Sequence, residues 1–596
     1  MARQGRYLVP IEPLPIFTYY DKQRFTQFGS MDSANWYGIA VESGKKKQAL
    51  YPAMGRKHVS LLNEVKLVFD SEPRAVFKTI NYMYVVDGTS VYVIDAAFNR
   101  RQIGTVHLGT NIWFDFLPVG NLVYAMMTDE QHIYVITEDG TSVTMGTVTD
   151  PLAPGGSTTG GKPLYVASFG NRFVVSVKDS PDFYLTTINL TGDLNTYFTI
   201  NGAALNARAS GIIGQMDVLH NTLYIFCDFT TDIWSNIITQ ITVAGVTREF
   251  PWKLNSSYNW DYGIADPFSL SVDFGRMCWL AKNATGLVSF MTSNGQMPQE
   301  ISTQAINVLL QGSAQDSSFT SPFIENTAKG FLYQYESTIF YRVSAGPYEN
   351  FGQLDVTADA NCLEYNFDTN TWHRCIELNG ERNRIESHTY FANTHLVTVQ
   401  SDPAMYQMAG NIYYNELRNM AQPDIQAPDA FLKYPMRYEA ITQQIYEEDY
   451  SEFKTQYVEI DFVFGEQSFY QSNAPFLNTV FVIKDGEPPD SPVYIVSEDN
   501  KFIIQDGTNT PTFDDNHYNA LFKPHIELYY SDDGGVTFIS ADLRPFAQLG
   551  QYRWRMRWYQ LGVSRNRCYK LICVSSAPIV ILGGVQLIER TSGGAN

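Results

Sequence analysis

Cysteine is scarce in this sequence of 596 residues. The six cysteines include no Cys-x-x-Cys pair, and so low a content excludes a fold held together by disulfides. Cys568 and Cys573 lie five residues apart, so on one strand they would face opposite sides of the sheet. They could then share neither a disulfide nor a metal ion. We expect buried free thiols, in a protein made in reducing cytoplasm.

Long apolar runs are also missing. No stretch approaches the ~20 uninterrupted apolar residues of a membrane span, so we expect no span. Near the N-terminus, Pro10, Pro13 and Pro15 alternate with polar residues where a secretory signal would have an apolar core. The most apolar tract, "APIVILGGVQLI" at 577–588, is expected to form two buried strands around a Gly-Gly turn.

Positive charge is in deficit. The sequence has 62 Asp and Glu against 42 Lys and Arg, a formal net charge of −20. Because binding to nucleic acid depends on cationic neutralisation of phosphates, this balance argues against high-affinity binding. It suits a wall that DNA must slide past without sticking. Hydrophobic residues at 44% and charged residues at 17% are typical of a folded globular chain.

Aromatic residues, by contrast, are abundant, at 14% of the chain. Aromatic and β-branched side chains favour strands. One pattern recurs: a strand-like run with alternating aromatics, a short Asp/Asn/Gly turn and a second run, which together predict a β-hairpin. The pattern occupies residues 80–95, 130–148, 220–235, 275–295, 361–378 and 393–408.

The hairpins recur at roughly the 40–60-residue spacing of four-stranded propeller blades. We therefore predict an all-β fold, with a β-propeller of six or seven blades at 61–435. A Pro-rich arm with the first strands precedes it at 1–60, and its polyproline-like stretch suits lying on a neighbour more than forming a core. A C-terminal β-sandwich-like module follows at 436–596, with a loop-rich insertion at 466–520. A large double-sheet sandwich is the competing architecture.

No catalytic, cofactor or metal site is predicted. Carboxylates near aromatic rings are numerous, but a glycosidase needs two that converge at a set separation. His373 and Cys375 would face one side of a strand and could bind a metal ion with Cys362; core packing beside Trp372 is the favoured interpretation. The segment "SDDGGVTF" at 531–538 matches the Asp-box pattern, which closes a hairpin turn and is not catalytic. Its residues are Ser531, Asp533, Gly535, Thr537 and Phe538.

The segment "RWRMRW" at 553–558 is unusual in so acidic a chain. On a strand its side chains alternate, with the apolar ones directed into a core and the arginines to the other face. Residues 544–570 hold seven basic residues and no acidic one, whereas 446–461 hold six acids and one lysine. Opposite charges in one module predict pairing, within a subunit or between neighbours, in preference to nucleic-acid binding. The predicted interface patch comprises Arg553, Arg555, Arg557, Arg565, Arg567, Glu447, Glu448, Asp449 and Glu452.

Several stretches together resemble a known family. They are "SGIIGQMDVLHNTLYIF" (210–226), "GIADPFSLSVDFGRMCWLA" (263–281), "MPQEISTQAINVLL" (297–310) and the C-terminal run from "YSDDGGVTF" through "YRWRMRWYQ" to the last strand. They are similar to the packaged-DNA stabilisation protein, or tail nozzle (tail hub), of short-tailed lambdoid bacteriophages. The similarity covers about two-thirds of the chain and consists of strand patterns and glycines.

The resemblance implies a structural virion protein of the phage tail, assembled in the host bacterial cytoplasm and not an enzyme. A hexameric ring would attach to the portal-associated adaptor ring, hold a needle or plug, and have spikes or fibres nearby. It would retain the packaged genome and later let double-stranded DNA pass. The N-terminal arm and residues 466–520 are longer than in the family. The alternatives are a receptor-binding or a glycan-hydrolysing tail protein on a β-propeller.

Overall fold

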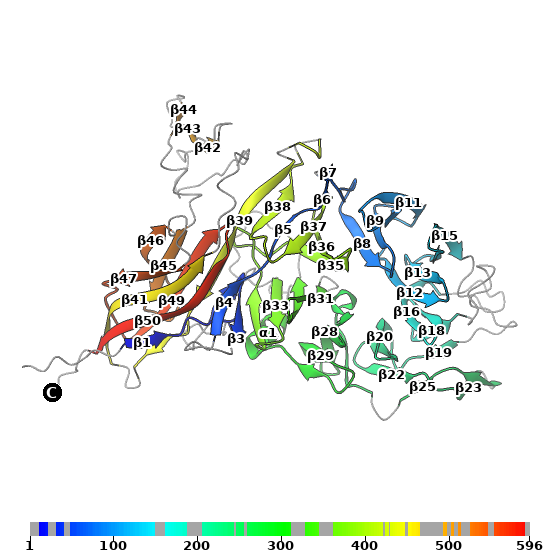
Figure 1. Cartoon of the computed structure of the whole chain (residues 1–596). Coiled ribbons are helices and arrows are strands. Elements are labelled where there is room, and N and C mark those ends of the chain that lie inside the picture. The colour runs from blue at the N-terminus through cyan, green and yellow to red at the C-terminus, as the bar shows by residue number, and fades with distance from the viewer. Residues whose placement is uncertain are drawn as a thin grey trace, which may run out of the picture. The chain divides into compact units, whose positions relative to one another are not determined.

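The structure is a computed structural model in which strands dominate (Figure 1). It describes residues 11–21, 31–40, 48–62, 64–148, 161–186, 206–243, 246–255, 259–311, 328–344, 362–420, 424–427, 430–447, 451–464, 493–496, 502–505, 511–513, 525–545 and 553–590. Within these ranges the one α-helix is α1 (Gln304–Gln311), close to the helix expected at 303–311. The prediction of an all-β fold is confirmed.

The chain divides into two compact units, and each is discontinuous. We call Val59–Val356 with Arg384–Gln407 the propeller unit. The sandwich unit consists of Met1–His58, Thr357–Asn383 and Met408–Asn596. These units differ from the continuous ranges 61–435 and 436–596 predicted from the sequence, because the N-terminal strands and two later segments pack with the C-terminal strands.

The propeller unit consists of small antiparallel sheets in chain order (Figure 1). The first three contain β8 (Pro73–Lys78), β9 (Met83–Asp87), β10 (Ser90–Ile94) and β11 (Arg100–Thr105); β12 (Trp113–Val119), β13 (Leu122–Thr128), β14 (Ile133–Glu138) and β15 (Val143–Val148); and β16 (Pro163–Phe169), β17 (Arg172–Val177), β18 (Asp182–Leu185) and β19 (Asn206–Arg208).

The remaining sheets of this unit follow the same meander. They contain β20 (Ile213–Leu219), β21 (Thr222–Cys227), β22 (Thr231–Ser235) and β25 (Lys253–Leu254); β26 (Tyr262–Ile264), β27 (Ser271–Asp273), β28 (Arg276–Asn283), β29 (Val288–Ser293) and β30 (Gln299–Glu300); β31 (Lys329–Tyr335) and β32 (Thr338–Ser344); and β35 (Ile385–Phe391), β36 (Thr394–Val399) and β37 (Met405–Ala409). A separate ribbon pairs β23 (Thr239–Val243) with β24 (Val246–Phe250).

The inner strands of these blades form a closed ring. Strand β12 contacts β16, β16 contacts β20, and the series continues through β27 and β31 to β35, which contacts β8. Phe77 of β8 stacks on Phe114 of β12 with ring centroids 4.1 Å apart. Residues 67–69 join the last blade, because the Met405 amide donates to the Leu67 carbonyl at 3.0 Å and the Phe69 amide donates to the Pro403 carbonyl at 2.9 Å. The described residues therefore form seven blades closed by an N-terminal segment.

Apolar clusters lie between neighbouring blades and hold the ring together. One such cluster, between the third and fourth blades, includes Phe169, Phe183, Leu223, Trp234 and Trp252. Burying a large apolar side chain is worth about 1.5–3 kcal/mol, so this cluster stabilises the contact between the third and fourth blades. The result is a block whose edges are short.

The sandwich unit has two packed sheets. The first contains β1 (Ile11–Leu14), β3 (Trp36–Ala40), β4 (Gln48–Pro52), β41 (Phe453–Phe464), β47 (Arg553–Tyr559), β48 (Val563–Ser564) and β50 (Ile579–Arg590). The second contains β2 (Asp32–Ala34), β5 (Gly55–His58), β33 (Cys362–Asn366), β34 (Thr371–Arg374), β38 (Tyr414–Arg418), β39 (Phe431–Ile441), β40 (Ile445–Tyr446), β45 (His525–Ser531), β46 (Ile539–Pro545) and β49 (Asn566–Ser575).

Shorter strands complete the description. In the propeller unit β6 (Ser60–Leu61) pairs with β7 (Glu64–Val65). Within the expected insertion at 466–520, β42 (Val493–Val496), β43 (Phe502–Gln505) and β44 (Pro511–Phe513) form a three-stranded sheet.

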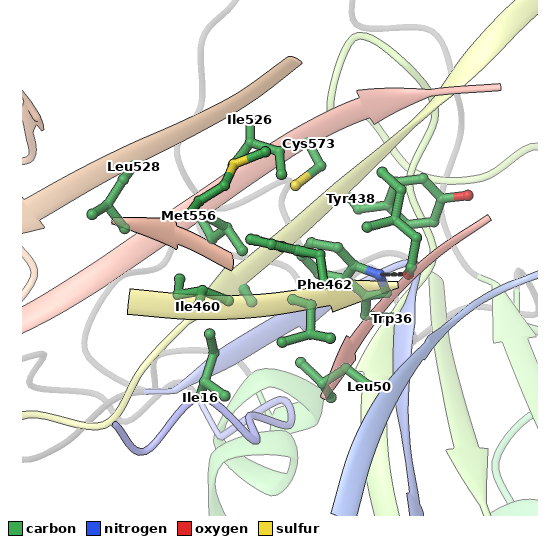
Figure 2. Close-up of a cluster of buried hydrophobic side chains, with 14 of the residues drawn as sticks. Ile16, Trp36, Leu50, Tyr438, Ile460, Phe462, Ile526, Leu528, Met556 and Cys573 are labelled. Carbon is green, nitrogen blue, oxygen red and sulfur yellow. Dashed lines mark hydrogen bonds between the residues drawn. The ribbon is translucent and has the colours of Figure 1, made fainter. Parts of the chain in front are cut away.

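Figure 2 shows the core between the two sheets of the sandwich unit. Ile460, Phe462 and Met556 of the first sheet face Tyr438 and Ile526 of the second. Trp36 stacks on Tyr438 with ring centroids 5.3 Å apart, and its indole Nε1 donates to the Ile579 carbonyl at 3.0 Å. The Trp36 indole therefore packs its apolar face on the second sheet, while its N–H group forms a hydrogen bond within the first sheet.

Two local predictions are wrong. The N-terminal arm does contribute to a core, since β1 pairs with β50 and both Leu14 and Ile16 are buried in the sandwich unit. Residues 579–590 form one strand, β50, with Gly583 and Gly584 inside it and not in a turn. A glycine is favoured at 584 because β1 approaches closely: a Cβ on Gly584 would lie 2.9 Å from Leu14 Cδ2.

The hairpin and cysteine predictions are confirmed. All six predicted hairpins form, as β9–β10, β14–β15, β21–β22, β28–β29, β33–β34 and β36–β37. The six cysteines are all buried and free. Among the described residues, no helix has the length and apolar character to cross a membrane.

Candidate functional site: an arginine strip at a sheet edge

Strand β47 carries the arginine strip, which we define as Arg553, Arg555 and Arg557. The burial pattern alternates as predicted, because Met556 and Trp558 are in the core while the three arginines are exposed. Among the described strands, β47 has a ladder partner only in β41, so it forms an edge of its sheet. Charged side chains on an edge strand discourage aggregation. The unpaired backbone N–H and C=O groups of such a strand can still form hydrogen bonds with a strand of another chain.

Two carboxylates on β41 neutralise part of the strip. Arg553 forms a bidentate pair with Asp461, with Nε–Oδ1 at 3.0 Å and Nη2–Oδ2 at 2.6 Å. Arg557 Nε donates to Glu459, and its guanidinium lies over the Tyr457 ring at 4.9 Å from the centroid. The side-chain hydrogen bonds to Asp461 and Glu459 raise the pKa of Arg553 and Arg557, respectively, so both stay charged.

Arg555 is the least neutralised member of the strip. Its guanidinium lies 3.8 Å from Glu459 Oε1 and 3.9 Å from Asp461 Oδ2, longer than a hydrogen bond. Its side chain is 63% exposed, whereas the two carboxylates are 10% and 8% exposed. Three arginines share two carboxylates, so the strip presents a net positive charge to solvent.

The other predicted patch residues have different surroundings. Arg565 and Glu452 form an exposed pair at 3.2 Å. Arg567 is fully buried; its Nε donates to Asp532 at 2.7 Å and its Nη1 to Thr455 at 3.1 Å. It therefore stabilises the interior of the sandwich unit and is not part of the exposed strip.

Only part of the acidic run predicted to face the arginines, Glu447, Glu448, Asp449 and Glu452, falls within the described residues. Glu447 follows β40, whereas Glu448 and Asp449 lie outside the described residues. The arginines instead pair with Glu459 and Asp461. These two acids were missed as site residues, although their spacing of two along a strand places them on one face.

The Asp-box residues form one turn between β45 and β46. Asp533 accepts bonds from the amides of Val536 and Thr537 at 3.0 and 2.9 Å, and Ser531 Oγ donates to it at 2.6 Å. Gly535 has a φ of +94°, which favours glycine. Lys570 Nζ lies 5.8 Å from the centroid of the Phe538 ring. Every polar group serves the turn, so this motif has a structural role.

The propeller unit also places two carboxylates on inner strands. Asp115 of β12 accepts a hydrogen bond from the Ser168 amide of β16 at 2.6 Å, and Asp217 lies on β20, the next inner strand. Burial raises the pKa of Asp115 to about 6. Burial and the charge of Asp115 together raise the pKa of Asp217 to about 7. The negative charge of Asp115 therefore disfavours ionisation of Asp217.

Comparison with known families bears on the propeller unit. Residues 58–350 match the family model described as "Bacteriophage P22 Gp10, beta-propeller". Residues 58–350 belong to the P22 Gp10 β-propeller family. The recognition of a phage DNA-stabilisation family is thereby confirmed, as is the propeller fold.

The match relates residues 58–350 to P22 Gp10-like DNA-stabilisation proteins, a family of phage structural proteins. The match does not reach the arginine strip, which lies in the C-terminal half of the chain. No curated protein matches the chain.

Solved structures similar to the chain are propeller-like but distant. The WD40 domain of Neurospora crassa Pan2 has 6% identity and a TM-score of 0.33, with 57% of this chain and 89% of that one covered. A catalytically inactive virginiamycin B lyase from Staphylococcus aureus has 9% identity and a TM-score of 0.32, with 60% and 99% covered. At such scores, the fold assignment rests on the strand topology and the P22 Gp10 match.

Proposed function

We propose that this protein forms a ring at the distal end of a short phage tail. In this role it is the tail nozzle or hub that closes the DNA exit channel, retains the packaged genome and becomes the conduit for ejection. The observation that carries the proposal is membership of the DNA-stabilisation family over residues 58–350. A hexamer, bound to the adaptor ring above and to a needle or plug, with spikes or fibres nearby, is the assembly that we expect.

The charge of the chain supports a conduit. A ring of chains, each with a formal net charge of −20, carries a strong negative field. A phosphate backbone gains no counterion release from an acidic wall, so DNA would move past it without being held. The closed seven-blade ring supports the mechanical part of the role, since it has no long exposed sheet edge in the described residues.

The arginine strip supplies a candidate contact between subunits. Arg555 carries a charge that Glu459 and Asp461 only partly neutralise, and β47 has an open edge among the described strands. A neighbouring acidic chain would complete the pairing, and electrostatic complementarity favours correct registration of subunits. We therefore place Arg553, Arg555 and Arg557 at the ring interface.

The mass of the purified assembly tests this arrangement. We expect the unmodified chain to form rings of six, and Arg555→Glu to shift the population to monomers by introducing repulsion next to Glu459 and Asp461. Arg544→Glu makes the same charge change in the sandwich unit at an exposed residue paired with Asp542 at 2.9 Å, and should assemble normally. Unchanged ring formation by Arg555→Glu would remove the strip from the interface.

One observation favours a second candidate function, glycan hydrolysis. Asp115 and Asp217 lie on inner strands of the propeller unit that both contact β16, and two carboxyl groups are what glycan hydrolysis uses. Activity on host-surface glycans that disappears in both Asp115→Asn and Asp217→Asn would establish it. Under the nozzle proposal the purified protein has no such activity, and specific glycan or cell binding by the isolated chain would favour the receptor-binding alternative instead.

A further inference from the structure

The hairpin of β33 and β34 in the sandwich unit brings three metal-ligating side chains together. Glu364 and His373 are direct partners across the ladder, and Cys375 follows His373 by two residues on the same face. The ligand atoms of these three side chains lie within 4.8 Å of one another. Among the described residues, this is the one cluster of three or more such groups.

The imidazole of His373 is buried against the Glu364 carboxylate. His373 Nε2 lies 3.0 Å from Glu364 Oε1, yet within the described part of the chain it makes no hydrogen bond with acceptable geometry. A cation placed between the carboxylate and the thiol would satisfy this nitrogen.

The strand register supplies a fourth possible ligand. The Cys375 amide donates to the Cys362 carbonyl at 3.0 Å, so the two cysteines are neighbours across the ladder and share the face of Glu364 and His373. Cys362 is buried, like the three clustered residues. Tyr37 lies beside the cluster, with its ring centroid 5.9 Å from that of His373.

We propose that Glu364, His373 and Cys375 bind a zinc-class transition-metal ion, with Cys362 as the fourth ligand. Sulfur, imidazole and carboxylate ligands suit Zn²⁺, and a tetrahedral ion holds neighbouring ligand atoms about 3.5 Å apart. The ligand atoms of Glu364, His373 and Cys375, which lie within 4.8 Å of one another, need only a small contraction to reach that spacing, and Cys362 would approach from its adjoining position on β33. Each coordinating thiol would lose its proton to solvent as the metal binds. Because all four side chains are buried, the site is closed and structural, fastening the β33–β34 hairpin.

Zinc titration of the untagged, chelator-treated chain in the presence of a non-thiol reductant tests the site. We expect one bound Zn²⁺ per chain, measured by elemental analysis after gel filtration. Cys375→Ser should weaken binding by more than about 100-fold, beyond the loss typical of residues that only orient a ligand. Cys573→Ser, which removes another buried thiol of the same unit, should bind zinc normally.

Two results would overturn the site: no stoichiometric zinc on the unmodified chain, or equal binding by Cys375→Ser. If Cys375→Ser fails to fold, Co²⁺ added to the unmodified chain gives a second readout. Thiolate-to-cobalt charge-transfer absorption with a tetrahedral visible spectrum supports the site, and a spectrum of hydrated Co²⁺ rules it out. Neither readout depends on ring assembly, so this proposal and the nozzle proposal can fail separately.

Discussion

Arg374 and Asp32, which are 342 residues apart in the chain, form a buried bidentate ion pair. Nε lies 2.9 Å from Oδ1 and Nη2 lies 2.6 Å from Oδ2, with Glu439 at 3.4 Å from the same Nη2. The pair joins β2 of the N-terminal segment to β34, inside the sandwich unit. Buried charges are stable only when paired, so this contact depends on all three segments being in place.

Arg374→Met should therefore destabilise the sandwich unit by about 3–5 kcal/mol, because it leaves the Asp32 carboxylate buried without its cation. Guanidinium unfolding measures the change. As a control, Glu452→Ala removes one partner of the exposed Arg565 pair and should leave the unfolding midpoint unchanged within error. A small effect of Arg374→Met would mean that Asp32 gains compensation from water or another cation.

Gly584→Ala should also destabilise the sandwich unit, by about 1–3 kcal/mol, since the new Cβ would overpack the contact between β50 and β1. It would lie 2.9 Å from Leu14 Cδ2 and 3.1 Å from the Glu459 carbonyl oxygen. Gly38→Ala is the matched control, because its Cβ would meet only Thr369 Cγ2 at an ordinary 3.9 Å. Thermal unfolding of the two variants distinguishes them, and equal stability would show that the N-terminal arm does not pack on β50.

The Asp-box turn predicts an acid-dependent loss of stability. Burial opposes ionisation of Asp533, but hydrogen bonds from Ser531, Thr537 and Val536 outweigh it and lower the pKa to about 2. A carboxyl group whose pKa is lowered by folding stabilises the folded state at pH values above its ordinary pKa, near 4. This stabilisation is lost as the pH falls towards the folded-state pKa, near 2. The Tm difference between the unmodified chain and Asp533→Asn should be largest above pH ~4 and shrink on acidification. A difference independent of pH would contradict this role.

The raised pKa of Asp217 in the propeller unit predicts a pH dependence of stability opposite to that of Asp533. Because the pKa of Asp217 is raised to about 7, its ionised form is disfavoured in the folded state. The resulting loss of stability is complete above the folded pKa and disappears as the pH falls towards the ordinary value near 4. Asp217→Asn should therefore have a higher Tm than the unmodified chain at pH ~8 and the same Tm at pH ~4. A lower Tm at both values would mean that the carboxylate is a stabilising hydrogen-bond acceptor.

Local structure could be predicted from the sequence because it depends on neighbouring residues. The alternation of "RWRMRW" correctly placed Met556 and Trp558 in the core and the arginines outside, since a strand has a period of two. The hairpins could be predicted because Asp, Asn and Gly adopt the conformations of the short turns that join two strands. The Gly-Gly pair was misread, because the same residues serve a turn or a close strand approach, and only the position of Leu14 decides between them.

Pairing over long distances could not be predicted. Arg557 lies 98 residues from Glu459, and which strand lies beside β47 depends on the packing of the whole sheet. The interface prediction therefore selected Glu447, Glu448 and Asp449, the densest acidic run, in place of Glu459 and Asp461. The unit boundaries could not be predicted for the same reason. The segment Thr357–Asn383 lies between two parts of the propeller unit in the sequence but belongs to the sandwich unit in the structure.

DNA content of virions assembled without this protein is the most direct test of the central claim, that the chain closes the exit channel of a packaged phage. We predict that particles lacking it package their genome and then lose it, so that nuclease-protected DNA per capsid falls although packaging itself has occurred. Particles that keep a full genome and fail only to adsorb to the host would contradict the account.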